Sequence, residues 1–439
     1  MDNKAAIIGG GPAGLAAARA LKAFAIDFDI IEQCDDFGGL WNRDWDRSPI
    51  YDSAHFISSR TMSHFDGYPM PDHWPDYPRH DQILAYVRDF ARAFGLYDHA
   101  RFGLGAVSAA PIEDGWRVET TGGEARSYRW LICANGATWD PAVPEIPGAF
   151  SGDIRHSGAY QSAAEFDSAR VLVVGGGNSG ADIACDPAQR SAHAGISLRR
   201  GYWFIPKHFN GLPTDVYAAR QPKVPLWIRQ KVLKRRLLKL IGDPARLGLP
   251  TPDHELLETH PLMNDQVFHY LRHGDLRVYP DLKAVDGDDA VFADGSRAPF
   301  DRIVLATGYK WTIPFLDDAS NPFSDGKTNL PLCLFSPTRD DLFFLSFIKA
   351  AGSSITLFGE MAWIIARAID AQRAGGPASG RLRDQIDRND FDLRKGLKTV
   401  ASPRHDAYVD RDAYRAALDK LRSRMGWPKI EPAAAASGA

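Results

Sequence analysis

Two glycine-rich loops constrain the fold of this chain more than any other feature. Each follows a short apolar run, at residues 5–8 and 171–174, and each precedes a stretch that favours a helix. The fingerprint glycines are Gly9, Gly11 and Gly14 in the first loop and Gly175, Gly177 and Gly180 in the second. A strand, a tight glycine turn and a helix with this spacing bind dinucleotides, because free N–H groups at the helix start face the pyrophosphate. The sequence therefore predicts an α/β fold with two Rossmann-like dinucleotide-binding domains.

The residues that end the next predicted strand differ between the two loops. After the first loop this strand ends at Glu32, where a carboxylate can bind ribose hydroxyls. After the second loop it ends at Arg199 and Arg200. Arginine at this place suits a ribose 2′-phosphate and favours NADPH over NADH, although two solvated surface charges are the alternative. Lys207 is a further candidate for contact with this phosphate.

Length and composition exclude several classes of protein. With 439 residues the chain is long enough for two or three domains, and its net charge of −3 does not indicate nucleic-acid binding. The four cysteines are far apart, which argues against a CxxC redox pair, a disulfide framework or a zinc site. We find no apolar run long enough to cross a membrane, and the first strand starts too close to Met1 for a cleaved signal peptide. A cytoplasmic protein is expected.

The segment between the loops carries the most specific pattern in the chain. Residues 150–160 read FSGDIRHSGAY, and Phe150, Gly152, His156 and Tyr160 fill the pattern F-x-G-x-x-x-H-x-x-x-Y/W. The chain therefore resembles the flavin-containing monooxygenases, whose identifying motif this is. Residues 38–41, GGLW, resemble the GGxW that lies near the flavin in that family. This resemblance assigns the first loop to FAD.

The irregular stretch at residues 51–71 resembles the family's loop beside the flavin and the nicotinamide. Ile57 stands where many members carry an Asn beside the flavin, so the usual polar contact and the usual substrate range do not carry over directly. The candidate catalytic residues are His55, Ile57, Ser58 and His156. For His156, positioning of the hinge or of the nicotinamide cofactor and a purely structural role both remain open.

The resemblance also implies the domain order. Residues 1–152 and 304–439 would form an FAD domain with a small antiparallel β-meander, interrupted by an NADPH domain at 153–303 with a helical insertion. Strand ends similar to the family's A-T-G are Ala134, Asn135 and Gly136, then Ala306, Thr307, Gly308 and Tyr309. The other residues assigned to cofactor binding are Pro12, Ala13, Gly39, Leu40, Trp41, Ser59, Arg60, Val107, Asn178 and Ser179.

The function implied by the resemblance is NADPH- and oxygen-dependent oxygenation of a nucleophilic nitrogen or sulfur of a small organic substrate. Reduced FAD would form a flavin 4a-hydroperoxide, and bound NADP⁺ would shield it from water. Because the flavin carries the chemistry, neither a protein nucleophile nor a metal is required. The partners would be molecular oxygen and the substrate. The sequence leaves open whether the chain forms a homodimer.

Three other functions share this layout. A Baeyer–Villiger monooxygenase would oxidise ketones, but its motif ends in Trp where Tyr160 stands here. An uncoupled NADPH oxidase or a flavin-binding sensor is a second alternative, which the departure at Ile57 keeps open. A disulfide reductase would need the closely spaced cysteine pair that this sequence lacks.

Two further expectations concern helices. Residues 224–241 form a basic amphipathic pattern, which fits either a helix on a membrane surface or a helix docked on its own domain. Pro187 is expected to stop or kink the helix after the second loop.

Overall fold

The structure is a computed structural model that describes residues 3–221, 224–259, 261–323, 330–399 and 407–429. It divides into two compact units. Unit 1 comprises Met1–Trp45, Arg60–Ala137 and Trp311–Ala439, and unit 2 comprises Asp46–Ser59 and Thr138–Lys310. These units differ from the ranges expected from the sequence at their boundaries, because residues 46–59, 138–152 and 304–310 group with unit 2.

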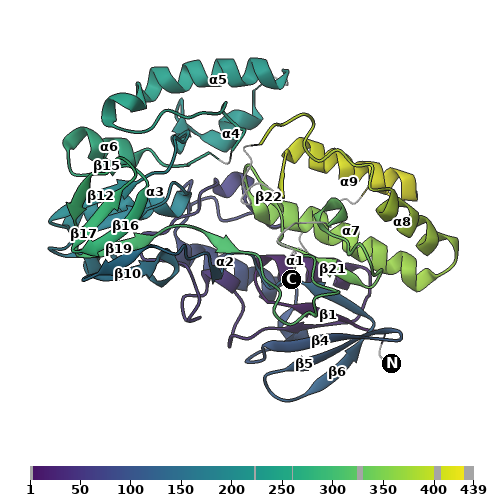
Figure 1. Ribbon diagram of the computed structural model, residues 1–439. Helices are drawn as coiled ribbons and strands as arrows, with labels where there is room; N and C mark the ends of the chain where they lie inside the picture. The colour runs from purple at the N-terminus through teal and green to yellow at the C-terminus, as the bar shows by residue number, and fades with distance from the viewer. Residues whose placement is uncertain (1–2, 222–223, 260, 324–329, 400–406, 430–439) are drawn as a thin grey trace. The chain divides into compact units, whose positions relative to one another are not determined.

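A five-stranded parallel sheet forms the centre of unit 1, in the order β21-β7-β1-β2-β3 (Figure 1). Its strands are β1 (Ala5–Ile8), β2 (Phe28–Ile31), β3 (Ala100–Arg101), β7 (Trp130–Cys133) and β21 (Leu342–Phe344). Helix α1 (Pro12–Ala23) packs against α7 (Ser354–Ala374). Strands covered on both faces need apolar side chains throughout, and every residue of β1, β2, β7 and β21 is buried.

The rest of unit 1 comprises a separate antiparallel sheet, further helices and one short strand pair. Strands β4 (Ala106–Ile112), β5 (Gly115–Thr120) and β6 (Ala125–Tyr128) form the predicted meander. The helices are α2 (His80–Ala93), α8 (Pro377–Arg388) and α9 (Arg411–Met425), and β22 (Lys349–Ala350) pairs with β23 (Tyr408–Val409). Short 3-10 turns include η1 (Gly39–Trp41) and η2 (Arg60–Met62).

Unit 2 repeats the parallel design in the order β10-β19-β11-β12-β15. These strands are β10 (Asp153–His156), β11 (Arg170–Val174), β12 (His193–Ser197), β15 (Arg277–Tyr279) and β19 (Arg302–Leu305). A second sheet contains β9 (Gly148–Phe150), β16 (Leu282–Gly287), β17 (Asp289–Phe292) and β18 (Arg297–Pro299). The helices of unit 2 are α3 (Asn178–Arg190), α4 (Thr214–Ala219), α5 (Leu226–Ile241) and α6 (Gln266–His273). The remaining pairs are β13 (His208–Phe209) with β14 (Leu212–Pro213), and β8 (Asp140–Pro141) with β20 (Tyr309–Lys310).

The structure confirms the α/β fold with two Rossmann-like units and the meander. It contradicts the expectation that Pro187 ends its helix early, because α3 continues to Arg190. Proline removes a single backbone donor, and the carbonyl of Pro187 accepts bonds from both the N–H (2.8 Å) and the hydroxyl (2.6 Å) of Ser191. Among the described residues, no helix is long and apolar enough to cross a membrane.

Candidate functional site

The first glycine loop lies at the carboxyl end of β1, where backbone segments approach closely. Gly9 has φ +111°, and a Cβ there would stand 2.5 Å from the carbonyl oxygen of Ala134. A Cβ on Gly14 would stand only 1.9 Å from the carbonyl oxygen of Gly9. Glycine is therefore required for α1 to pack directly over the loop, and Ala134 lies against the loop as the A-T-G resemblance implies.

Glu32 holds the first loop in shape. Its carboxylate accepts hydrogen bonds from the backbone N–H groups of Gly10 (2.5 Å) and Cys34 (2.8 Å), and the residue is only 4% exposed. Burial raises the pKa of Glu32, against the lowering effect of these bonds. Two carboxylate oxygens offer about four acceptor sites, so the bonds to the loop leave capacity for a ribose hydroxyl.

The GGLW turn packs on the same loop. Gly39 has φ +55°, and a Cβ there would stand 2.8 Å from Cα of Gly11. Leu40 and Trp41 complete the short η1 turn and are half-buried. The two adjacent glycines thus let this turn touch the loop backbone to backbone.

The second loop has the same backbone design in unit 2. Gly175 has φ +127°, and a Cβ there would stand 2.3 Å from the carbonyl oxygen of Ala306. A Cβ on Gly180 would stand 2.1 Å from the carbonyl oxygen of Gly175. The Asn178 side-chain oxygen accepts a hydrogen bond from the N–H of Met263 (2.9 Å).

Both helix starts fit the phosphates of a dinucleotide. The N-cap residues are Gly11 for α1 and Gly177 for α3, and among the described residues neither has a side-chain cap bond or an acidic residue in its first turn. The first turns of both helices therefore carry no acidic side chain of their own, and the helix dipole favours an anion there. Pro12 at the start of α1 has no backbone N–H, so Ala13 and Gly14 supply the N–H groups that follow it.

Arg199 and Arg200 follow β12, which ends at Ser197, two residues before the end expected from the sequence. Arg199 is exposed, while Arg200 is half-buried with an Nε that has no hydrogen-bond partner among the described residues. The Arg200 guanidinium lies 5.5 Å from the ring centroid of Tyr202. That ring rests on the loop, since a Cβ on Gly176 would stand 2.1 Å from it. Lys207 is half-buried in the same unit.

Each fixed residue of the 150–160 motif has a distinct contact within unit 2. Phe150 packs against the apolar cluster around Val285 and Phe292. Gly152 is needed because a Cβ there would stand 2.2 Å from the carbonyl oxygen of Asp301. The Tyr160 hydroxyl donates to Asp186 (2.7 Å).

His156 ties the motif to the strand end at residues 306–309. Its Nε2–H donates to the carbonyl of Gly308 (2.9 Å), and its Nδ1 accepts from the N–H of Gly158 (3.0 Å). Tyr309 packs edge-on against the imidazole, at 5.0 Å between centroids. Burial lowers the pKa of His156, so the neutral ring with the proton on Nε2 is favoured. With both nitrogens engaged, the described contacts of His156 are those of a positioning residue.

The segment carrying the other candidate catalytic residues belongs to unit 2 up to Ser59. His55 is exposed, and its Nδ1–H donates to the carbonyl of Ser53 (2.9 Å). Ile57 is half-buried, while Ser58 and Ser59 are buried. The Ser59 N–H donates to Asp215 (2.7 Å), but its hydroxyl has no partner among the described residues. Arg60 belongs to unit 1, where it pairs with Asp72 at 3.0 Å.

A buried polar stripe on α3 anchors this segment, and sequence reasoning missed it. Asp186 accepts from the hydroxyls of Ser53 (2.6 Å) and Tyr160 (2.7 Å). Asp182 accepts from the Asn264 amide (2.6 Å). Burial, together with the charges of Asp182 and Asp186 nearby, raises the pKa of Tyr51. Burial raises the pKa of both aspartates. The signal was the spacing of Asn178, Asp182 and Asp186, which puts three polar side chains on one face of a helix that packs on a sheet.

The remaining candidate residues differ in their contacts and in their exposure. The Asn135 amide donates to the carbonyl of Thr312 (3.0 Å), and its Oδ1 has no partner among the described residues. The Thr307 hydroxyl donates to the carbonyl of Ala142 (2.7 Å). Gly136 and Gly308 have φ of +80° and +88°, typical of a turn after a strand. Val107 lies in β4 with 56% of its surface exposed.

Comparison with known proteins decides the family. The model of the flavin-binding monooxygenase-like family matches residues 2–423. This chain belongs to that family. Similar flavin-binding monooxygenase relatives include indole-3-pyruvate monooxygenase YUCCA1 of Oryza sativa subsp. japonica, 30% identical over 79% of this chain and 86% of that protein. Human flavin-containing monooxygenase 5 is 30% identical over 79% of this chain and 70% of that protein.

Solved structures show the same fold. An open crystal structure of cyclohexanone monooxygenase matches with a TM-score of 0.72 and 17% identity, covering 96% of each chain. Tmm from Pelagibacter sp. strain HTCC7211 matches with a TM-score of 0.68 and 18% identity, covering 97% of this chain and 87% of that one. The protein is thus a flavoprotein monooxygenase, an oxidoreductase of the flavin-binding monooxygenase-like family.

Proposed function

We propose that unit 1 binds FAD, that unit 2 binds NADPH, and that the enzyme oxygenates a nucleophilic nitrogen or sulfur of a small organic molecule. The observation that carries this proposal is the pair of equivalent glycine loops with opposite charges beside them. Glu32 is buried against the first loop, whereas Arg199 and Arg200 follow β12 beside the second. A carboxylate suits ribose hydroxyls, and guanidinium groups suit a 2′-phosphate.

In the proposed reaction, NADPH, a proton, dioxygen and the substrate give NADP⁺, water and the N- or S-oxide. Bound flavin supplies the electron transfer and the activation of oxygen. The residues of the chain bind the two cofactors and orient them. The turn of Gly39, Leu40 and Trp41 would border the flavin site, and the first-turn N–H groups of α1 and α3 would hold the phosphates. His156 keeps residues 306–309 in place through Gly308.

The proposed role of residues 51–59 is to form one wall of the site on the nucleotide side. Tyr51 and Ser53 attach this segment to α3, and α3 begins at the second glycine loop. Because His55, Ile57 and Ser58 follow these two anchored residues closely in sequence, the anchors restrict where the three residues can lie. The side chain of Ile57 has no hydrogen-bond donor or acceptor, so we propose that it makes an apolar contact with the substrate.

Rapid mixing tests this function. The purified protein is reduced by NADPH without oxygen, mixed with oxygenated buffer, and followed by absorbance. A long-lived species distinct from oxidised and reduced flavin, which decays faster when a sulfide or amine is added, supports the proposal. Faster decay with ketones alone would indicate Baeyer–Villiger chemistry. Immediate return to oxidised flavin with release of peroxide would indicate an oxidase, and failure to accept electrons would indicate a sensor.

We propose a cytoplasmic location. The four cysteines are free, and three of them, Cys133, Cys185 and Cys333, are buried. Unpaired cysteines suit a reducing compartment.

A further inference from the structure

Helix α5 is the most basic element of the described chain. Its sequence, LWIRQKVLKRRLLKLI, contains six Lys and Arg residues and no acid, in a protein whose net charge is −3. Pro225 precedes the helix and Gly242, with φ +79°, ends it. The concentration of positive charge is therefore local and confined to one regular helix.

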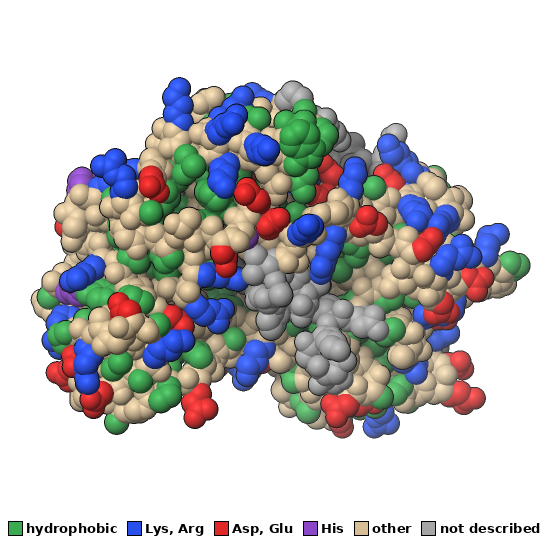
Figure 2. All heavy atoms as spheres, turned by 45° about the horizontal axis from the view of Figure 1, so that its top comes forward, with side chains coloured by type: hydrophobic (Ala, Val, Ile, Leu, Met, Phe, Trp, Pro, Cys, Tyr) green, Lys and Arg blue, Asp and Glu red, His purple; other side chains and the backbone are tan. Residues whose placement is uncertain are grey.

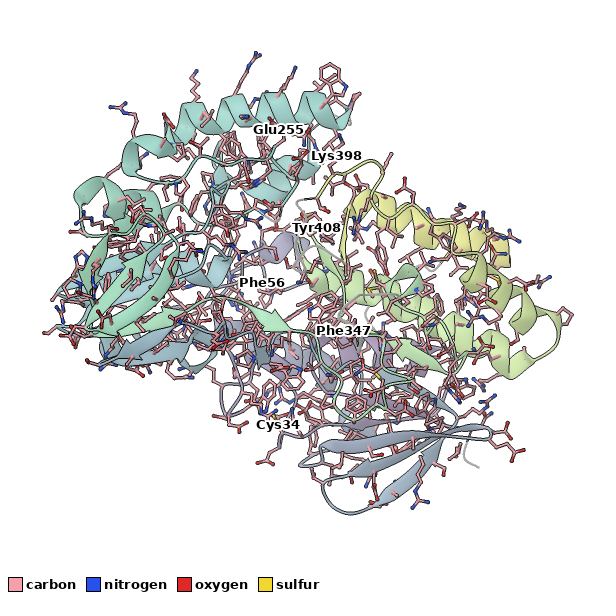
Figure 3. The ribbon with its side chains drawn as sticks, viewed as in Figure 1. Cys34, Phe56, Glu255, Phe347, Lys398 and Tyr408 are labelled. Atoms are coloured by element: carbon pink, nitrogen blue, oxygen red, sulfur yellow. The ribbon has the colours of Figure 1, made fainter. Side chains whose placement is uncertain are left out.

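One face of α5 is docked on unit 2. Leu237 and Ile241 are 1% and 6% exposed. The Gln230 amide donates to the carbonyl of Leu256 (2.9 Å), and Lys234 pairs with Glu255 at 3.3 Å; Figure 3 labels Glu255 on this inner side of the helix. These contacts fix the orientation of α5, so its opposite face is presented to the solvent.

The outer face combines positive charge with large apolar side chains. Val232 and Leu240, which are 41% and 56% exposed, lie among the cations of this face. Trp227, 61% exposed, lies in the first turn of the helix, seven residues before Lys234 and therefore nearer the docked side. The exposed cations on this face are Arg229, Lys231, Arg235, Arg236 and Lys239. Arg236 bonds to the hydroxyl of Tyr217 (2.6 Å), but in the described part of the chain none of the five pairs with an acidic side chain. Figure 2, which turns this side of the molecule forward, shows blue and green side chains together over the helix.

We propose that the outer face of α5 binds the surface of a bilayer that contains anionic phospholipids. A helix that lies in a membrane interface needs cations for the headgroups and an aromatic or aliphatic residue that can enter the acyl boundary. α5 supplies cations, Val232 and Leu240 on its outer face, and Trp227, the residue type that favours this boundary, is exposed at the N-terminal end of the helix. This inference is independent of the proposed function.

The apolar residues decide between lipid and nucleic acid as the partner. Phosphates of either kind would satisfy the cations. A nucleic-acid backbone, however, gives Val232 and Leu240 no apolar surroundings, whereas a bilayer buries both. Because no described helix could cross a membrane, the attachment would be peripheral and sensitive to salt.

Co-sedimentation of the intact flavoprotein with lipid vesicles tests the proposal. One set of vesicles is phosphatidylcholine alone, and the other contains equal parts of phosphatidylcholine and phosphatidylglycerol. We expect binding only to the second set, and its loss at high salt. Lys231→Glu with Arg235→Glu should weaken binding at least about 30-fold, since each surface cation contributes about 1 kcal/mol. Trp227→Ala, at unchanged charge, should weaken it by a smaller factor.

The matched control removes the same charges elsewhere. Arg117 and Arg381 are also exposed and form no ion pair within the described residues, so Arg117→Glu with Arg381→Glu should leave vesicle binding unchanged. Circular dichroism and flavin content verify that each variant folds. Equal binding to both vesicle sets, equal loss in the control, or binding of duplex DNA without binding of vesicles would overturn the proposal. None of these outcomes depends on the oxygenation reaction.

Discussion

The two glycine loops have nearly the same backbone and very different surroundings. In each, the first glycine lies against the carbonyl of an alanine at a strand end, Ala134 in unit 1 and Ala306 in unit 2. Beside the first loop lies buried Glu32, and beside the second lie Arg199, which is exposed, and Arg200. The similar backbones suit a pyrophosphate in both loops, and under the proposed function the side chains one strand away select the dinucleotide that each loop binds.

The helices that follow the loops differ as well. α1 buries an almost wholly apolar face of alanines and leucines. α3 instead carries Asp186 among its buried residues, and this carboxylate accepts hydrogen bonds from Ser53 and Tyr160. The buried face of α1 thus only packs, whereas α3 also forms hydrogen bonds to Ser53 and Tyr160. Each prediction below tests one part of this contrast.

The largest expected effect comes from adding a methyl group to the third glycine of each loop. Gly14→Ala places a Cβ 1.9 Å from the Gly9 carbonyl, and Gly180→Ala places one 2.1 Å from the Gly175 carbonyl. We expect Gly14→Ala to purify without FAD. Gly180→Ala should keep FAD but lose NADP⁺ binding, measured by titration calorimetry. Gly380→Ala, which meets nothing within 4 Å, is the control. If Gly180→Ala lost FAD and kept NADP⁺, the assignment of cofactors to loops would be reversed.

The second prediction tests the contribution of the two arginines independently of the glycine loop. Arg199→Ala or Arg200→Ala removes a charge-assisted bond worth about 1.5–3 kcal/mol, so NADPH should bind about 10- to 150-fold more weakly. NADH, which has no 2′-phosphate, should bind as before. Dissociation constants for both nucleotides give the result, with Arg117→Ala as an exposed control. Equal losses for NADPH and NADH would refute the 2′-phosphate assignment.

The third prediction concerns the anchor on α3. Tyr160→Phe deletes the bond to Asp186 but keeps the stacking on Phe166, at 4.9 Å between centroids. We expect a loss of about 1.5–3 kcal/mol in the free energy of unfolding and weaker NADP⁺ binding. Tyr128→Phe makes the matched change in unit 1, where it loses a 2.9 Å bond to Asp29. That variant should lose stability without a change in NADP⁺ affinity; an equal change in affinity would argue against the anchor.

Asp186 gives the anchor a pH dependence. Burial raises the pKa of Asp186 in the folded protein. A raised folded pKa means that the stability this group contributes is present at low pH and is lost as the pH rises through that pKa. Asp186→Asn keeps an acceptor oxygen but cannot ionise. The melting temperature of the variant relative to the wild type should therefore increase as the pH rises from about 4, the pKa of an unfolded aspartate, as scanning calorimetry from that pH upward would measure. A difference that stays constant or falls would contradict the burial of a charged carboxyl.

Local patterns predicted the fold and both loops, but not the α3 anchor. Strand, glycine turn and helix are neighbours in sequence, so the spacing of Gly9, Gly11 and Gly14 reports them directly. The contact between Ser53 and Asp186 joins residues 133 positions apart. No local pattern contains it, and the grouping of residues 46–59 with unit 2 depends on that kind of contact.

The smallest expected effect is at Val107, which the resemblance assigned to cofactor binding. Its side chain is 56% exposed on β4, so a contact with FAD would have to come from its backbone. Val107→Thr keeps the β-branched shape and the backbone, and surface changes of this kind usually alter stability by less than about 0.5 kcal/mol. We expect unchanged flavin content and an unchanged FAD dissociation constant. Val107→Pro removes the backbone N–H, and a selective loss of FAD in that variant, with the meander still folded, would establish a backbone contact. Loss of FAD in Val107→Thr would instead show that the side chain itself binds, contrary to its exposure.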